Sequence, residues 1–143
     1  PYKDLIHQVV IISSKEKEVS SSEAHQRVKS SSLYASRSLR AEHNLESLLH
    51  AFKQADWPMI YQLCWDDFQD MHHLFESCSQ PFSYITEESR ALLKVFEGMW
   101  ELGDGPLVTM DAGPNIHLLY RSDQLELSEQ IKADYLTGRY HVL

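Results

Sequence analysis

The chain has 143 residues, 43% of them hydrophobic, which is enough for one domain-sized core and leaves little room for a second. Its formal net charge of -8 at pH 7 argues against a protein built to neutralise nucleic-acid phosphates, which needs a basic face. The apolar runs are much shorter than the roughly 20 residues of a membrane span, and no basic-plus-apolar leader is present, so we expect a soluble protein.

The first predicted element is a strand. Residues 5–13 are rich in Ile and Val and are too short to compete well as a helix. After them, Ser20, Ser21, Ser22 and Glu23 can cap a following helix. A helix start with several hydroxyls and unbonded N–H groups is suited to phosphate, although serine-rich caps are also ordinary structural features.

Three helical patterns follow, each with apolar residues at the spacing of a one-sided helix. Pro58 marks the start of the second pattern, and Thr86, with Glu88 and Ser89 nearby, marks the start of the third. The apolar positions are Leu45, Leu48, Leu49 and Phe52; then Ile60, Leu63, Cys64, Met71, Leu74 and Phe75; then Leu92, Val95, Phe96 and Met99. We interpret all three stripes as core.

Two polar residues interrupt the second stripe. Asp67 falls in its middle, where a carboxylate needs a partner, so either a structural partner satisfies it or it faces a cleft. We interpret His72, at the edge of the stripe, as a hydrogen-bonded core histidine. His72 and His73 would point about 100° apart on a helix, and no His or Cys pair has metal-ligand spacing, so no protein-bound metal is predicted.

A strand pair follows the third helix. Residues Pro106–Thr109 and Ile116–Tyr120 are two short apolar runs separated by a Gly-Pro turn. Gly113 would tolerate positive φ there, and Pro114 would lock φ. Together they would hold Asp111 rigidly at the end of a strand.

Asp111 has two interpretations at this stage. It can form an Asx turn by bonding its own backbone two residues on. Alternatively, it is a general base or orienting carboxylate that faces a ligand, with the small residues Ala112 and Gly113 allowing that ligand to approach closely.

The order of these elements predicts the fold class. Leu127, Ile131 and Tyr135 indicate a closing helix after the strand pair. Strand, helices, strand pair and helix make an α+β layer, with helices on one face of a small, mostly antiparallel sheet. Cys64 and Cys78 show no CxxC pattern and indicate reduced, intracellular packing residues rather than a disulfide or metal site.

Three sequence blocks resemble one enzyme family. Residues 110–115 resemble the Met/Phe-Asp-Ala-Gly-Pro-Asn signature of the diphosphomevalonate decarboxylases, in the superfamily of galactokinase, homoserine kinase and mevalonate kinase. Met71–His72 followed by residues 81–84 resembles the Met-His and Pro-Pro-Phe-x-Tyr segment of that family. Residues 17–21 resemble its Lys-x-Val-Ser-Ser loop. The blocks occur in the family's order, over roughly residues 5–135.

The resemblance implies a domain assignment. Residues 1–143 would be the C-terminal substrate-binding and catalytic domain, with a split βαβ, ferredoxin-like arrangement. The glycine- and serine-rich loop with which the superfamily cradles ATP has no candidate here, so we expect an N-terminal ATP-binding domain outside this chain. ATP and Mg²⁺ would bind mainly through that domain, and the isolated chain would turn nothing over.

The resemblance also implies an activity, the ATP-dependent decarboxylation of mevalonate 5-diphosphate to isopentenyl diphosphate in the mevalonate pathway of isoprenoid biosynthesis. Asp111 would orient or deprotonate the C3 hydroxyl of this small anionic substrate. A cytoplasmic enzyme is expected, with neither nucleic-acid nor membrane partners. Exposed edge strands in this domain type leave a homodimer open.

The loop that would hold the 5-diphosphate departs from the family pattern. The family has Ser-Ser-Arg/Thr followed by Gly-Met, whereas Ser20 and Ser21 are followed here by Ser22 and Glu23. The missing charge would come from Arg27, or less readily from His25, one helical turn further on. Ala112 and Gly113 would complete the substrate contacts.

Three alternatives remain open from the sequence. The altered loop suggests a sister decarboxylase acting on mevalonate 5-monophosphate. A kinase that phosphorylates mevalonate without decarboxylation is disfavoured by the presence of Asp111. A non-catalytic ferredoxin-like binding module is the third alternative, because a fold alone does not establish activity.

Overall fold

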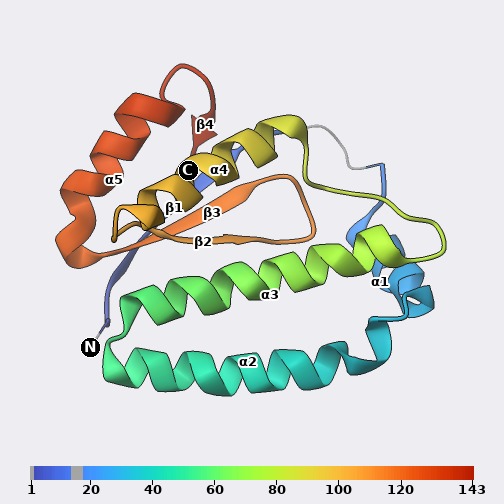
Figure 1. Ribbon diagram of the computed structural model, residues 1–143. Helices are drawn as coiled ribbons and strands as arrows, with labels where there is room; N and C mark the ends of the chain where they lie inside the picture. The colour runs from blue at the N-terminus through green and yellow to red at the C-terminus, as the bar shows by residue number, and fades with distance from the viewer. Residues whose placement is uncertain (1, 14–17) are drawn as a thin grey trace.

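The computed structural model describes residues 2–13 and 18–143, and it has an α+β fold, as predicted (Figure 1). Within these residues, four strands form one sheet in the order β2-β3-β1-β4, and every neighbouring pair is antiparallel. The strands are β1 (Leu5–Ile11), β2 (Leu107–Met110), β3 (Ile116–Arg121) and β4 (His141–Val142). This order, with the first and third strands at the centre, is that of a ferredoxin-like split βαβ layer.

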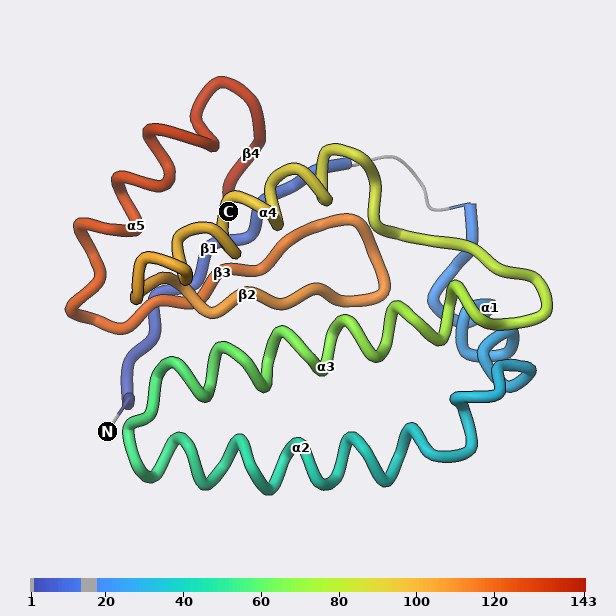
Figure 2. The backbone as a smooth tube through the Cα atoms, in the orientation of Figure 1, coloured from blue at the N-terminus to red at the C-terminus, as the bar shows by residue number. Residues whose placement is uncertain are grey.

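Among the described residues there are five α-helices, and their path is clearest in the backbone trace (Figure 2). They are α1 (Ser21–Arg27), α2 (Tyr34–Gln54), α3 (Trp57–Ser77), α4 (Glu87–Glu101) and α5 (Leu125–Ile131). The predicted start signals are confirmed. Ser20 and Thr86 cap α1 and α4 by accepting hydrogen bonds from the backbone of Glu23 and Ser89, and Pro58 lies in the first turn of α3.

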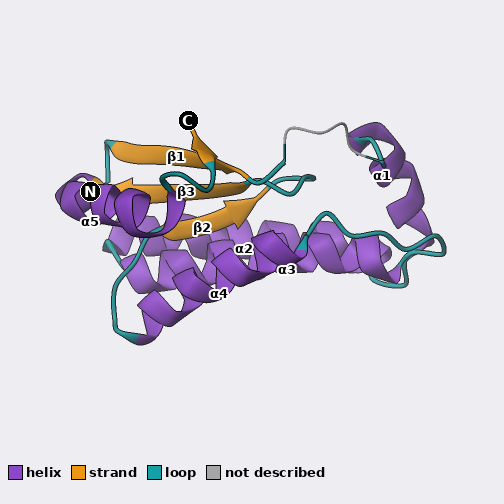
Figure 3. Cartoon of the chain, turned by 90° about the horizontal axis from the view of Figure 1, so that it is seen from above, coloured by secondary structure: helices purple, strands orange, loops and turns teal. Residues whose placement is uncertain are grey.

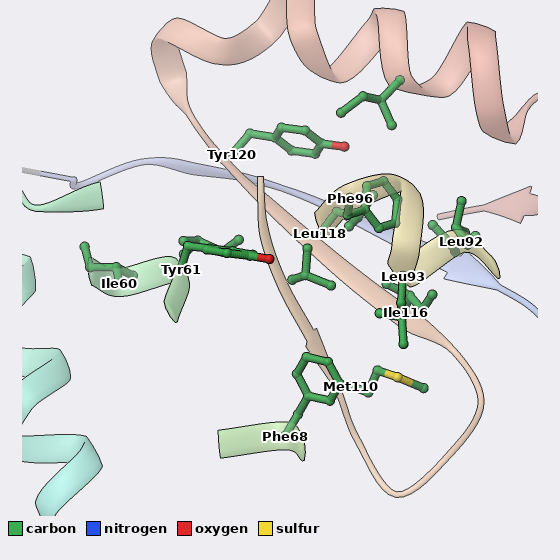
Figure 4. Close-up of a cluster of buried hydrophobic side chains, with 14 of the residues drawn as sticks. Ile60, Tyr61, Phe68, Leu92, Leu93, Phe96, Met110, Ile116, Leu118 and Tyr120 are labelled. Atoms are coloured by element: carbon green, nitrogen blue, oxygen red, sulfur yellow. The ribbon is translucent and has the colours of Figure 1, made fainter. Parts of the chain in front are cut away.

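One face of the sheet carries most of the packing. Successive side chains of a strand point to opposite faces, so every second residue lies on this face. Ile116, Leu118 and Tyr120 alternate along β3 as fully buried residues and pack with α4 (Figure 4). The α5 helix covers the same face, where the side-chain amide of Gln8 donates to the carbonyl of Ser128 at 3.4 Å. Figure 3 shows α5 in front of the strands and α4 running alongside them. This face holds the main core.

The α2 and α3 helices form a long antiparallel pair along the β2 edge of the sheet (Figure 1). Asp67 on α3 binds the guanidinium of Arg37 on α2 at 2.9 and 3.2 Å. The structural interpretation of Asp67 is therefore confirmed, since its partner is an arginine on the neighbouring helix.

The expectation that every apolar stripe residue belongs to the core is wrong for α2. Leu45 and Leu49 are each 53% exposed, whereas Leu48 and Phe52 pack against the core. The α2 helix packs mainly against α3, so only a narrow strip of its surface is buried. An apolar stripe predicts a helix more securely than it predicts the width of the buried face.

A second apolar cluster lies at the C-terminal end of α3. Its buried members are Val19, Ala24, Val28, Leu74, Phe75 and Tyr84, with Met71, Phe82 and Ala112 at its border. The hydroxyl of Tyr84 donates to the carbonyl of Val19 at 2.7 Å. Through these contacts the second apolar cluster holds α1 beside the turn between β2 and β3.

The cysteines are packing residues, as expected. Cys64 and Cys78 are both free thiols, and Cys78 is buried. Burial, with a smaller contribution from Asp67, raises the pKa of the Cys64 thiol to about 11, so this thiol is protonated at neutral pH. No helix in the described part of the chain combines the length and apolar character needed to cross a membrane.

Candidate functional site

Asp111 is exposed at the first position after β2, in the turn that leads to β3. The last residue of β2, Met110, pairs with Ile116, the first residue of β3, and both side chains are buried. The strand pair therefore closes immediately beside the turn, and the position of Asp111 relative to the sheet is set by a packed ladder.

The turn backbone is anchored from two helices. On α3, Nε2 of His72 lies 3.1 Å from the backbone oxygen of Asp111. On α4, the hydroxyl of Ser89 donates to the carbonyl of Pro114 at 2.9 Å. Ser89 itself is fully buried at the first turn of its helix. Both ends of the turn are thereby tied to rigid elements.

A third anchor joins the turn to the end of β1. The side-chain oxygen of Asn115 accepts the backbone N–H groups of Ile12 and Ser13 at 2.9 and 3.3 Å. One amide thus satisfies two backbone donors that have left the sheet ladder. This bond spans more than 100 residues of sequence.

The expected role of Gly113 is wrong in one respect. Within the described residues, positive φ occurs at Ala55, Gly103 and Gly138, and Gly113 is not among them. The loop between the strands has five residues, and a loop of that length reverses the chain without a left-handed residue. The rigidity of the turn comes from its side-chain anchors.

The Asp111 carboxylate stays available. Among residues 2–13 and 18–143, no group donates a hydrogen bond to this carboxylate, and no cation pairs with it. The Asx-turn interpretation is therefore not supported by the structure. The backbone of Asp111 is held while its side chain points to solvent, an arrangement that suits a positioned acid or base.

His72 is a buried, hydrogen-bonded histidine that lies among aromatic rings, as predicted. Its exposed fraction is 1%, and its ring lies nearly perpendicular to those of Phe68, Phe75 and Tyr84. Burial lowers the pKa of His72, and the hydrogen bond to the Asp111 carbonyl only partly opposes this effect. The ring is therefore neutral near pH 7 and acts as a hydrogen-bonding group.

The serine segment starts α1, as predicted. The hydroxyl of Ser20 accepts from the backbone of Glu23 at 3.2 Å, and Ser21 and Ser22 are exposed in the first turn. His25 is exposed as well. Lys17, at the start of the loop motif, lies outside the described residues.

Arg27 has partners within its own helix and beyond it. Its guanidinium forms an ion pair with Glu23, one turn earlier, and lies over the ring of Phe82 with 5.5 Å to the ring centre. The bonds to Glu23 use Nε and Nη2. Within the described part of the chain, Nη1 makes no further hydrogen bond, so it still has donors for an anion.

The second apolar cluster brings the two predicted parts of the site into one region. Tyr84 belongs to this cluster and feels charges from both parts. Burial raises the pKa of its hydroxyl, Glu23 and Asp111 raise it further, and Arg27 lowers it. Charges from α1 and from the β2–β3 turn therefore act on the same phenol. The α1 segment and the residue after Asp111 both contribute to the second apolar cluster, so the two parts of the site lie in the same region of the molecule.

Sequence reasoning missed the anchors of the site. Ser89 was interpreted only as a helix-start signal, and Asn115 only as part of a motif. Each bonds a segment far away in the sequence, so no local pattern indicates its partner. Tyr84 lies in a recognisable block, but its bond to Val19 is equally non-local.

Residues 7–139 match the family model described as the mevalonate 5-diphosphate decarboxylase C-terminal domain. The chain belongs to this family. The match includes Asp111, its turn anchors and the α1 segment. The comparison with curated proteins found no match.

Solved structures agree with this assignment. A mevalonate diphosphate decarboxylase from Legionella pneumophila is 60% identical, with a TM-score of 0.94 over 100% of this chain and 46% of that one. A mevalonate pyrophosphate decarboxylase from Streptococcus pyogenes shares the fold at 22% identity, with a TM-score of 0.85 over 97% of this chain and 43% of its own.

A third similar structure contains ligands. The protein MDDEF, in complex with MVAPP, AMPPCP and magnesium, is 24% identical, with a TM-score of 0.84 over 96% of this chain and 43% of that one. The present chain therefore spans less than half the length of these structures.

Proposed function

We propose that this chain is the substrate-binding and catalytic C-terminal domain of a longer enzyme that decarboxylates mevalonate 5-diphosphate with ATP, giving isopentenyl diphosphate. The observation that carries the proposal is Asp111, an exposed carboxylate on a turn whose backbone is anchored by His72, Ser89 and Asn115. Family membership supports it, because the family model is that of mevalonate 5-diphosphate decarboxylases.

The chemistry explains why a fixed carboxylate is needed. Asp111 takes the proton of the C3 hydroxyl, and the oxygen attacks the terminal phosphate of ATP, with ADP leaving. The C3–O bond then breaks with phosphate as the leaving group. The electrons of the C1–C2 bond form the alkene, and the carboxylate departs as carbon dioxide. A positioned base contributes about 10²- to 10⁴-fold to such a proton transfer.

The 5-diphosphate would lie at the start of α1. Its ligands in this proposal are the hydroxyls of Ser20, Ser21 and Ser22 and the Nη1 donors of Arg27, with His25 as an additional exposed group. The backbone at Ala112 and Gly113 would line the path between this anion and Asp111. The second apolar cluster, which joins α1, Tyr84 and Ala112, supports that placement.

ATP and Mg²⁺ would be held mainly by an N-terminal domain outside this chain. In the described residues, no group of three or more His, Cys, Asp or Glu side chains gathers in a way that could hold a metal ion. MDDEF was solved with AMPPCP and magnesium, and it is more than twice as long as this chain. We infer that the isolated domain forms no ADP, a prediction that a coupled ADP assay on the 143-residue chain checks.

We further propose a cytoplasmic homodimer. The free thiols of Cys64 and Cys78 fit a reducing compartment. The exposed leucines Leu39, Leu45 and Leu49 give α2 an apolar surface that a second copy can cover. Sedimentation of the complete protein tests the dimer, since a monomer at micromolar concentration would contradict it.

The decisive experiment for the function is ADP release by the full-length protein, offered mevalonate 5-diphosphate and the 5-monophosphate in parallel. Turnover of the diphosphate supports the proposal. A preference for the monophosphate would show that the departure at Ser22 and Glu23 changed the specificity. Silence with both substrates would favour a non-catalytic ferredoxin-like binding module.

A further inference from the structure

His72 occupies the point where the two parts of the proposed site meet. Its ring nitrogen Nε2 lies 3.1 Å from the backbone oxygen of Asp111. Its ring centre is 6.3 Å from that of Tyr84, with the two planes at 84°. Tyr84 in turn donates to the carbonyl of Val19, the residue before the serine segment. A continuous set of contacts thus runs from Asp111 to α1 through one buried imidazole.

The surroundings of His72 define its tautomer. A backbone carbonyl only accepts hydrogen bonds, so Nε2 must carry the proton that it donates to Asp111. Nδ1 is then left as a bare acceptor, and it is buried without a hydrogen-bond partner in the described part of the chain. Phe68 and Phe75 flank the ring at 6.2 and 5.3 Å between centres. One hydrogen bond and three aromatic neighbours therefore determine the orientation of this ring.

We propose that His72 is a positioning residue for Asp111. Its neutral ring, protonated at Nε2, fixes the carbonyl of Asp111 and, through Tyr84, holds the turn in register with the serine segment of α1. The hydrogen bond and the position of the turn do not depend on any activity. The effect on catalysis rests on the proposed function, in which Asp111 acts on a substrate bound at Ser20–Ser22.

The place of Asp111 in the chain explains why a hydrogen bond to its carbonyl also positions its side chain. It is the first residue after β2, so the strand fixes only its amino side, and His72 fixes its carbonyl side. Rotation of that carbonyl displaces the backbone of the turn together with the Asp111 side chain. A displacement of about 1 Å at a reacting group costs about 100-fold in rate.

The first test does not depend on activity. Long-range proton–nitrogen NMR spectra of the complete protein at pH 7 report the tautomer of each histidine, and a His72→Gln sample assigns the His72 signals. We expect a neutral ring protonated at Nε2. A ring protonated at Nδ1, or an imidazolium, would overturn the proposal.

The second test measures kinetics with mevalonate 5-diphosphate. His72→Phe keeps an aromatic ring but loses the donor, whereas His72→Gln keeps an amide donor near the position of Nε2. We expect kcat to fall by about 10- to 100-fold in His72→Phe, with KM nearly unchanged, and to recover most of that loss in His72→Gln. If His72→Phe does not fold, His72→Asn replaces it, because its shorter amide does not reach the carbonyl.

A matched control separates positioning from general stability. Tyr120→Phe removes another buried hydrogen bond, the 2.8 Å bond from its hydroxyl to Gln8, on the sheet face covered by α5. It should lower the melting temperature and leave kcat at the wild-type value. An unchanged kcat in His72→Phe, or an equal loss in the Phe and Gln variants, would refute the positioning role. If the wild-type enzyme is silent, the proposed function fails, and the NMR test alone decides the role of His72 in the turn.

Discussion

Asn115 provides the most direct structural test of how the turn is held. Its side-chain oxygen accepts two backbone N–H groups, from Ile12 and Ser13, and these groups are part-buried. Asn115→Leu keeps a similar volume but removes the acceptor. Asn115→Asp keeps an acceptor and is the matched control.

The expected cost follows from the two donors. An unsatisfied buried donor costs about 1–3 kcal/mol, and partial exposure places each of these two near the lower limit, so we expect Asn115→Leu to lose about 2 kcal/mol of unfolding free energy. Asn115→Asp should lose less than half of that. Urea unfolding of the chain at pH 7 measures the difference from the change in midpoint, provided that the slope stays constant.

Amide hydrogen exchange locates the effect. The N–H groups of Ile12 and Ser13 should exchange faster in Asn115→Leu than in the wild type, with little change in the centre of the sheet. Unchanged exchange at these two amides, or equal destabilisation by the Leu and Asp variants, would show that Asn115 does not anchor the turn to β1.

Two further predictions concern other parts of the chain. A Cβ at Gly105 would lie 2.8 Å from the indole nitrogen of Trp100, so Gly105→Ala should destabilise the fold by about 1–3 kcal/mol. Gly98 lies inside α4 and has nothing within 4 Å of such a Cβ, so Gly98→Ala should stabilise the fold by about 0.5–1 kcal/mol. Urea unfolding compares the two variants, and a change of stability with the same sign in both would contradict this prediction. Because burial lowers the pKa of His72, its contribution to stability is complete above its ordinary pKa of about 6.5 and is lost as pH falls towards the lower folded value. His72→Gln should therefore lose less stability between pH 7 and pH 5 than the wild type does, and parallel losses in urea unfolding would contradict this.

Local signals predicted the elements well. The strand at residues 5–13, the helix starts at Pro58 and Thr86, and the strand pair around Asp111 all follow from residue types within a few positions of one another. The two-residue strand β4 (His141–Val142) was missed, because two residues carry no periodicity and only pairing with β1 defines it.

The site could be predicted only in part. The sequence indicated Asp111 from its motif and its turn, but the structure shows why its backbone is rigid. The hydrogen bonds that hold the turn come from His72, Ser89 and the end of β1, and the sequence gives no local sign of these pairings. Asp67 shows the same limit, since its partner Arg37 lies 30 residues away on another helix.

The measurement that tests the central claim most directly compares Asp111→Asn with wild type in the full-length enzyme, using carbon dioxide release from carboxyl-labelled mevalonate 5-diphosphate and the substrate Kd together. Asp134→Asn, at an exposed aspartate outside the proposed site, is the control. We expect Asp111→Asn to lower kcat by at least about 100-fold while Kd stays nearly unchanged, because the carboxylate acts on the proton transfer. Wild-type rates of carbon dioxide release in Asp111→Asn would contradict the account.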